Sequence, residues 1–230
     1  MKVAISQSNY IPWKGYFDLI SKVDVFVLYD DMQYTRRDWR NRNKIKTPQG
    51  LQWLTIPVEV KGKYLQKINE TRISDPSWAG NHLKSIELNY KKAAYYDVWF
   101  PKIAAWYAEA GSFEYLSEVN HYFLREICKC FKIETKLVDS RDFQISGAKT
   151  DALISVIDQL SAVSEYFSGP SAKNYLEEAP FNERNIEIKW MEYTAYPEYS
   201  QTGDTFEHGV SILDAIFQMG IRCTEFMKFK

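Results

Sequence analysis

The order strand, helix, strand in the first thirty residues constrains the fold more than any other feature of the chain. Lys2–Gln7 is a short apolar segment, Trp13–Ser21 carries apolar residues at helical spacing, and Val23–Tyr29 is an almost continuous apolar run. Such a run is typical of a strand that is covered on both faces, as in a parallel sheet. Parallel neighbours joined through a helix form a right-handed βαβ unit. The opening of the chain therefore predicts an α/β protein.

The rest of the chain continues to alternate between helical and extended patterns. Helices are predicted over residues 76–92, 100–110, 115–131, 172–176 and 210–219, and a further helix begins at Thr150. Strands are predicted over residues 51–58, 133–138, 166–168 and 186–191, with a hairpin or sheet extension within 59–74. We expect a single three-layer α/β domain over residues 1–230, with a mainly parallel, Rossmann-like central sheet. In this prediction residues 1–58 and 133–230 form the sheet core, and residues 76–131 form an inserted helical layer.

Charge and composition exclude several classes of protein. The chain has 29 Lys and Arg against 30 Asp and Glu, a net charge of −1, which argues against duplex nucleic acid as a partner. No apolar run approaches the roughly 18 residues of a membrane span, and Met1–Gln7 becomes polar too early for a signal peptide. The three cysteines and three histidines lack the spacing of metal ligands, so no metal site is predicted. We therefore expect a cytoplasmic protein with no membrane span.

Polar and aromatic residues follow the first strand, where open α/β sheets place their ligands. Asp30 and Asp31 end the neighbouring strand, so their carboxylates should reach the same edge of the sheet. The alternative interpretation of this segment is an ordinary strand-to-helix turn with aromatic packing. The predicted site residues from the segment are Gln7, Asn9, Tyr10, Trp13, Gly15 and Tyr16.

A basic segment follows the second strand and lacks apolar periodicity. Residues 36–46 contain six Arg and Lys against a single Asp, and aromatic and amide side chains lie between them. We expect a long exposed loop that closes over a phosphate, because guanidinium groups match phosphate geometry. The alternative is a solvated or packed structural segment. The predicted ligand-binding residues of this region are Gln33, Arg36, Arg42, Asn43 and Lys46, with Gly169, Ser171 and Lys173 approaching from the other side.

Several of these motifs together resemble the WbqC-like protein family. They are Gln7-x-Asn9-Tyr10-x-Pro12-Trp13-x-Gly15-Tyr16-Phe17, Asp30-Asp31-x-Gln33-Tyr34, Arg42-Asn43-Lys44-Ile45-Lys46, Trp53-Leu54-Thr55-Ile56-Pro57, Ser168-Gly169-Pro170-Ser171, Tyr199-x-Gln201 and Ser211-Ile212-Leu213-Asp214. Ser8 departs from the family pattern, which usually has proline after the glutamine. The resemblance implies an association with bacterial surface-polysaccharide (O-antigen) gene clusters. It also implies a glycine or aminoacyl transferase that acylates an amino sugar.

A more distant likeness concerns the fold. The strand, the segment Pro12-Trp13-Lys14-Gly15-Tyr16 and the helix after it are similar to the His-x-Gly-His start of nucleotidylyltransferases and pantothenate-synthetase-like ligases. Trp13 and Tyr16 stand in the places of the two histidines. Neither side chain is a cationic donor to a triphosphate at neutral pH, so the likeness supports the fold and not adenylyl transfer.

Two hypotheses about function follow. In the first, an amide forms on an amino-sugar nucleotide or another phosphorylated small molecule, with ATP or an activated aminoacyl donor supplying the acyl group. Asp30 or Asp31 is the base, Gln7 and Asn9 donate to the oxyanion, and the basic segment binds the diphosphate. In the second, the protein is a non-catalytic module that binds a nucleotide or sugar phosphate for a partner enzyme.

Overall fold

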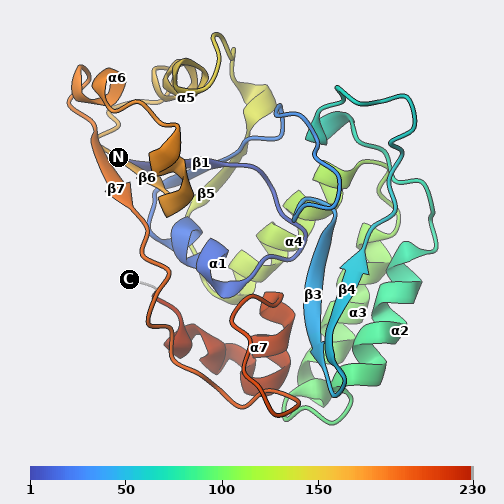
Figure 1. The fold of residues 1–230 in the computed structure, drawn as a ribbon. Coiled ribbons are helices and arrows are strands. Elements are labelled where there is room, and N and C mark those ends of the chain that lie inside the picture. Colours follow the sequence, from blue (N-terminus) through green and yellow to red (C-terminus); the bar gives the residue numbers. More distant parts are fainter. Residues whose placement is uncertain (229–230) are drawn as a thin grey trace.

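The central sheet has five strands, and every neighbouring pair runs parallel (Figure 1). The computed structural model describes residues 1–228. The sheet has the order β5-β2-β1-β6-β7 and consists of β1 (Lys2–Ser6), β2 (Val25–Leu28), β5 (Lys136–Asp139), β6 (Glu165–Ser168) and β7 (Glu187–Trp190). The strand order reverses on either side of β1. The predicted parallel sheet is confirmed.

Helices cover both faces of this sheet. On one face, Ala4, Phe26 and Leu28 share a core with α1 (Lys14–Ser21), α3 (Tyr96–Ala110), α4 (Leu116–Cys130) and α7 (Ile212–Met219). On the other face, Val3, Ile5, Val25 and Val27 pack against α5 (Thr150–Ile157) and α6 (Ala179–Asn182). Neighbouring residues of a strand point to opposite faces, so these apolar runs supply two cores at once. The three-layer α/β fold is confirmed.

The inserted helical region consists of α2 (Trp78–Tyr90), α3 and α4, and α2 packs against α3 and α3 against α4. Two antiparallel strands, β3 (Arg42–Thr47) and β4 (Gly50–Thr55), lie beside these helices (Figure 1). They form a separate sheet. The assignment of all of residues 1–58 to the central sheet is therefore wrong for residues 42–55.

The prediction of a long exposed loop over residues 36–46 is also wrong for its second half, because residues 42–47 form β3. The inward positions of β3 include Asn43 and Ile45, which are buried, while Arg42 and Lys44 lie on its outward side. Asn43 Nδ2 donates to the carbonyls of Tyr10 and Ile11, at 3.2 and 2.8 Å. A polar residue in an inward position hid the alternation that marks a strand.

Two shorter segments also differ from the prediction. Residues 59–74 contain isolated bridges and a 3-10 turn, Ile68–Glu70, and not a hairpin. The short helix predicted at 172–176 is a 3-10 helix, Pro170–Asn174. Two further 3-10 segments are Ser140–Asp142 and Gly220–Phe226.

A histidine lies inside the helical core. His82 Nε2 donates to the Thr55 carbonyl at 3.1 Å, so its Nδ1 accepts from the Tyr10 hydroxyl at 2.8 Å. Tyr107 lies 2.5 Å from the same hydroxyl. Burial lowers the pKa of His82 from 6.5 to about 4, against the opposing effect of the Thr55 hydrogen bond. The imidazole is therefore neutral in the folded protein at neutral pH.

This burial predicts a loss of stability in mild acid. Because the pKa of His82 is lowered in the folded state, the unfolded chain binds the proton first, and the stability contribution present above pH 6.5 is lost as the pH falls towards about 4. The loss should reach roughly 3 kcal/mol at the end of that window. Urea unfolding of the wild type and of His82→Gln across this pH range measures it. The variant should be less stable at neutral pH and should depend less on pH; equal slopes would contradict the assignment.

Candidate functional site

A cavity of about 990 Å³ opens at the carboxyl ends of β1 and β6, where the strand order reverses. Open α/β sheets bind ligands at this position, and the volume is that of a small-molecule site. Its polar lining comes from five separate parts of the chain. The lining includes Ser6, Gln7, Tyr29, Asp31, Lys67, Arg141, Lys149, Ser168, Gly169, Ser171 and Tyr175.

One wall of the cavity carries an ionised carboxylate. Asp31 accepts hydrogen bonds from Lys67 Nζ at 2.9 Å and from Ser140 Oγ at 2.7 Å. Partial burial raises the pKa of Asp31, but the hydrogen bonds from Ser140 and Lys67 outweigh it and hold that pKa below its usual value. The carboxylate therefore faces the cavity as an anion, and it can pair with a cationic group of a ligand.

Cationic groups surround the same cavity. Besides Lys67, its lining includes Arg141 and Lys149. Lys149 precedes the first turn of α5, so the positive end of that helix dipole also points to the cavity. Gly147, with φ of +79°, makes the turn into the helix, and a Cβ there would lie 2.7 Å from Cβ of Asp151. These features suit the phosphates of a nucleotide or a sugar phosphate.

Asp30 lies behind the cavity wall and is completely buried. Its Oδ1 accepts from the Ser8 backbone N–H at 2.8 Å, and its Oδ2 accepts from Ser8 Oγ at 2.7 Å and from His121 Nε2 at 2.8 Å. His121 Nδ1 lies 3.5 Å from Asp139 Oδ2. Asp30 thus joins the ends of β1 and β2 to α4, whereas its neighbour Asp31 faces the cavity.

Arg40 orients two of the predicted amide side chains. Its guanidinium donates to Gln7 Oε1 and to Asn9 Oδ1. Because arginine has no acceptor, both amide oxygens must face it, and the two NH₂ groups point elsewhere. The Tyr16 hydroxyl donates to the Gln7 carbonyl at 2.8 Å and fixes the backbone of the same residue. Gln7 therefore lines the cavity as an oriented hydrogen-bond donor.

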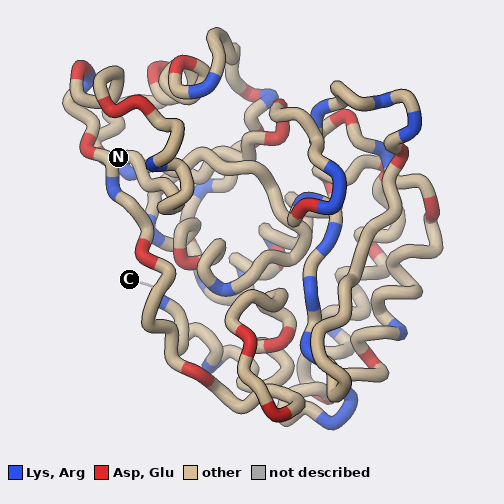
Figure 2. The backbone as a smooth tube through the Cα atoms, viewed as in Figure 1, with Lys and Arg blue, Asp and Glu red and all other residues tan. Residues whose placement is uncertain are grey.

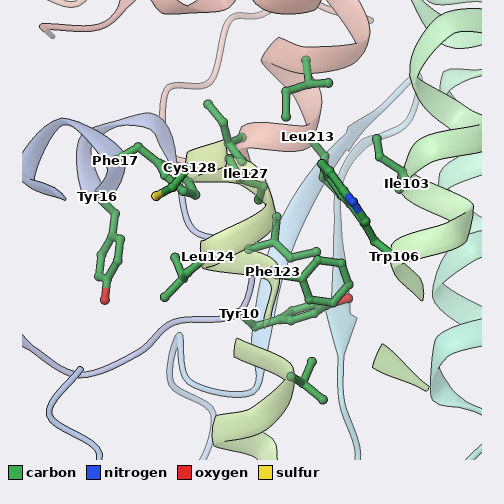
Figure 3. Close-up of a cluster of buried hydrophobic side chains, with 14 of the residues drawn as sticks. Tyr10, Tyr16, Phe17, Ile103, Trp106, Phe123, Leu124, Ile127, Cys128 and Leu213 are labelled. Atoms are coloured by element: carbon green, nitrogen blue, oxygen red, sulfur yellow. The ribbon is translucent and has the colours of Figure 1, made fainter. Parts of the chain in front are cut away.

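Other predicted site residues are buried in the protein core. Tyr10 and Tyr16 belong to the cluster shown in Figure 3. Tyr16 is on α1, whereas Tyr10 contacts His82 of α2, Tyr107 of α3 and Phe123 of α4. Trp13 packs edge-on against Tyr193 and Tyr196. A Cβ at Gly15 would lie 2.4 Å from the Trp13 ring, so glycine is required there by packing.

The basic segment divides into a buried part and an exposed part. Lys46 is buried, and its Nζ donates to the carbonyl and hydroxyl of Thr205 at 2.5 and 3.1 Å. The expectation of one exposed lid is therefore wrong for residues 42–46. Gln33, Arg36 and Lys173 are exposed and Arg42 is half-buried, and all four lie outside the cavity lining. Arg36 Nη2 donates to the Val60 carbonyl and Gln33 Nε2 to the Tyr64 carbonyl. The cations of Arg42 and Lys173 lie over Trp53 and Trp190. Their role in binding a ligand remains a prediction.

The motifs Tyr199-x-Gln201 and Ser211-Ile212-Leu213-Asp214 hold residues 192–211 against the rest of the protein. Asp214 is buried, and it accepts hydrogen bonds from Tyr90, Tyr199 and Gln201 at 2.8–2.9 Å. Lys14 is buried among Tyr196, Tyr199 and Phe206, and its Nζ lies 3.0 Å from His208 Nδ1. Burial lowers the pKa of Lys14 to about 8.

Sequence reasoning missed three cations of the cavity and one histidine behind it: Lys67, Arg141, Lys149 and His121. Two local signals could have found Arg141 and Lys149. Asp139-Ser140-Arg141 ends a parallel strand, and Gly147-Ala148-Lys149-Thr150 leads into a helix. Arg141 also affects the ionisation of Asp139. Burial raises the pKa of Asp139, but the hydrogen bonds from Arg141 outweigh burial and hold that pKa below its usual value.

Residues 1–228 contain neither a metal-binding cluster nor a membrane-spanning helix. Within them, no group of three or more His, Cys, Asp or Glu side chains is arranged to hold a metal ion. No helix of the same range is both long and apolar enough to cross a membrane.

Comparison with known proteins places this chain in a family. The model of the WbqC-like protein family matches residues 7–225. The chain is also 48% identical to an uncharacterized protein of Mycobacterium tuberculosis, over 99% of this chain and 98% of that protein. No solved structure matches the chain. Since the family match spans nearly the whole sequence, from Gln7 beside the cavity to the final 3-10 segment, this chain belongs to the WbqC-like protein family.

Proposed function

We propose that this protein is an aminoacyl (glycyl) transferase that forms an amide on an amino sugar or sugar nucleotide in bacterial surface-polysaccharide biosynthesis. One observation carries the proposal: the ionised carboxylate of Asp31 shares a cavity with three cationic side chains at the switch point of a parallel sheet. A nucleotide sugar with a free amine presents the complementary charges, two phosphates and one ammonium. The resemblance and the family membership supply the choice of an aminoacyl group.

The cations and the helix dipole bind the diphosphate in this proposal. Lys149 and the first turn of α5 lie on one side of the cavity, and Arg141 is the middle residue of the 3-10 segment that follows β5. Charge-assisted hydrogen bonds from such groups are stronger than neutral ones. They take over the role that the sequence assigns to Arg36, Arg42 and Lys46.

Asp31 orients the amine and accepts its proton. The amine nitrogen attacks the carbonyl carbon of ATP-activated or otherwise activated glycine, a C–N bond forms, and the bond to the leaving group of the donor breaks. The substrate ammonium must lose one proton to become the attacking amine and a second as the amide forms. The Asp31 carboxylate is the anion in the cavity that can take the first proton, and the second departs with the leaving group of the donor. Gln7, held by Arg40, donates an amide N–H to the oxyanion that develops on the carbonyl.

A second candidate function is a non-catalytic module that binds a nucleotide or sugar phosphate for a partner enzyme. The observation in its favour is the lining of the cavity, which includes neither histidine nor cysteine among the described residues. Such a site can bind a phosphorylated ligand without the usual strong nucleophiles.

The first prediction separates these two functions. Wild-type protein is incubated with amino-sugar nucleotides, glycine and ATP or glycyl-tRNA, and products are identified by mass spectrometry. Asp31→Asn should lower product formation by about a hundredfold or more, because the proton acceptor is lost. Binding of the same nucleotide sugar should weaken by only a few-fold, since Asp31 does not contact the phosphates.

The control for this experiment is Asp97→Asn, which alters an exposed carboxylate at the start of α3. This variant should match the wild type, and melting curves confirm that each variant is folded. Equal activity of Asp31→Asn and the wild type would remove Asp31 from the mechanism. Nucleotide binding without product from any donor would establish the binding module.

The second prediction concerns the phosphate site. Lys149→Ala should weaken binding of UDP by about tenfold or more, because a charge-assisted hydrogen bond is worth roughly 1.5–3 kcal/mol. The melting temperature without UDP should stay the same, since Lys149 is exposed. Calorimetric titration measures the affinity, and Lys92→Ala, an exposed lysine after α2, is the matched control. Equal affinities of both variants would place the phosphates elsewhere.

A further inference from the structure

Positive charge is concentrated in one continuous part of this nearly neutral protein. Residues 32–67 contain nine Lys and Arg against two Asp and Glu, whereas the remainder of the chain contains 20 against 28. Figure 2 shows these cations along β3 and on the loops before and after the β3–β4 hairpin. Among the ion pairs of residues 1–228, none involves Arg36, Arg37, Arg42, Lys44 or Lys61. An uncompensated field of one sign attracts an anionic partner.

The same part of the chain exposes large apolar side chains. Six of the ten exposed large hydrophobic side chains of the described residues lie in it: Met32, Trp39, Leu51, Trp53, Tyr64 and Leu65. Tyr64 and Leu65 are the most exposed of all, at 80% and 78%. They follow Gly62, whose φ of +73° makes the tight turn between Lys61 and Lys63. Clustered exposure of this kind marks an interaction surface.

These cations and apolar groups are connected by contacts. The loop at 59–67 joins the segment at 32–36, because Tyr34 N–H donates to the Gln66 carbonyl and Arg36 Nη2 to the Val60 carbonyl, each at 2.9 Å. The segment then continues to Trp39, whose ring centroid lies 5.5 Å from that of Trp53. The Arg42 guanidinium lies 4.0 Å from the Trp53 ring centroid. We call residues 32–44, 51–53 and 59–67 the basic aromatic surface.

We propose that the basic aromatic surface docks this protein on a lipid bilayer that contains anionic headgroups. Arginine and lysine are attracted to anionic lipids, and Trp and Tyr favour the interface between headgroups and acyl chains. The exposed leucines decide between a bilayer and a nucleic acid. Single-stranded RNA would use the cations and the tryptophan rings, but it offers no apolar region for Leu51 and Leu65, which acyl chains do.

Docking through this surface is independent of the proposed reaction, although the two sites adjoin. Met32 and Lys67 belong to the basic aromatic surface and also line the cavity. The cavity therefore opens beside the docked face, so a substrate held at the bilayer has a short path to Asp31.

The test is co-sedimentation of the full chain with vesicles of phosphatidylcholine, with and without phosphatidylglycerol. The protein should bind the vesicles that contain phosphatidylglycerol, bind neutral vesicles weakly, and dissociate as salt screens the charges. The double variant Arg37→Glu, Lys61→Glu should lower the partition coefficient at least tenfold, because two attractive charges become repulsive. Tyr64→Ser, Leu65→Ser should lower it by about tenfold and leave the salt dependence intact.

A matched control changes charge and apolar area elsewhere. Lys92→Glu with Leu88→Ser alters exposed residues of the α2 region, outside the basic aromatic surface, and should bind vesicles like the wild type. All variants should keep the wild-type affinity for UDP, so a failure of docking is distinguishable from a failure of the nucleotide site. Absence of binding to anionic vesicles, equal losses in the control, or tighter binding to a polyuridine oligonucleotide than to vesicles would each overturn the proposal.

Discussion

The buried carboxylate of Asp30 is the interaction on which the arrangement at the sheet edge depends. It accepts three hydrogen bonds, two from Ser8 just beyond β1 and one from His121 on α4. The Asp30 backbone N–H donates in turn to Ser140, after β5. A polar group taken out of water must be compensated in this way, and leaving such a group without its partner typically costs about 1–3 kcal/mol. One residue thereby fixes the ends of β1, β2 and β5 relative to each other, through its carboxyl group and its backbone N–H.

The turn after β1 is held from its other side by the basic segment. Ile11 has φ of +37°, a conformation that a β-branched residue rarely adopts. The surrounding structure must therefore enforce it, and Asn43 does so by donating to the Tyr10 and Ile11 carbonyls. The Arg40 guanidinium also donates hydrogen bonds to Gln7 and Asn9. The segment that follows β2 therefore sets the path of the segment that follows β1. Much of the basic segment is thus part of the scaffold, and the rest of it is surface.

The sequence predicted the α/β architecture because apolar runs and helical spacing are local signals. The candidate site was harder to predict, since its residues meet only in the folded chain. Asp31 lies 36 residues from Lys67 and 109 from Ser140, and no local pattern links them. Asp30 and Asp31 are adjacent in the turn after β2, but their carboxyl groups point apart. Only the structure shows that Asp31 faces the cavity and Asp30 the core. The strand β3 was missed for a related reason. Asn43 is a buried polar residue in this strand because its amide donates hydrogen bonds to the distant turn at Tyr10 and Ile11.

Lys67 lines the cavity, where it pairs with Asp31, and it also belongs to the basic aromatic surface. Its Nζ is 2.9 Å from Asp31 Oδ1, and its side chain is 46% exposed. The Asp31 anion is therefore neutralised by a half-exposed cation and not by a buried one, and such an ion pair contributes little stability. In the proposed reaction, a phosphate that draws Lys67 away leaves Asp31 available to the substrate ammonium. Lys67 then binds the phosphate of the ligand and Asp31 binds its ammonium. Binding of the anionic part of the substrate and recognition of its amine are therefore coupled through Lys67.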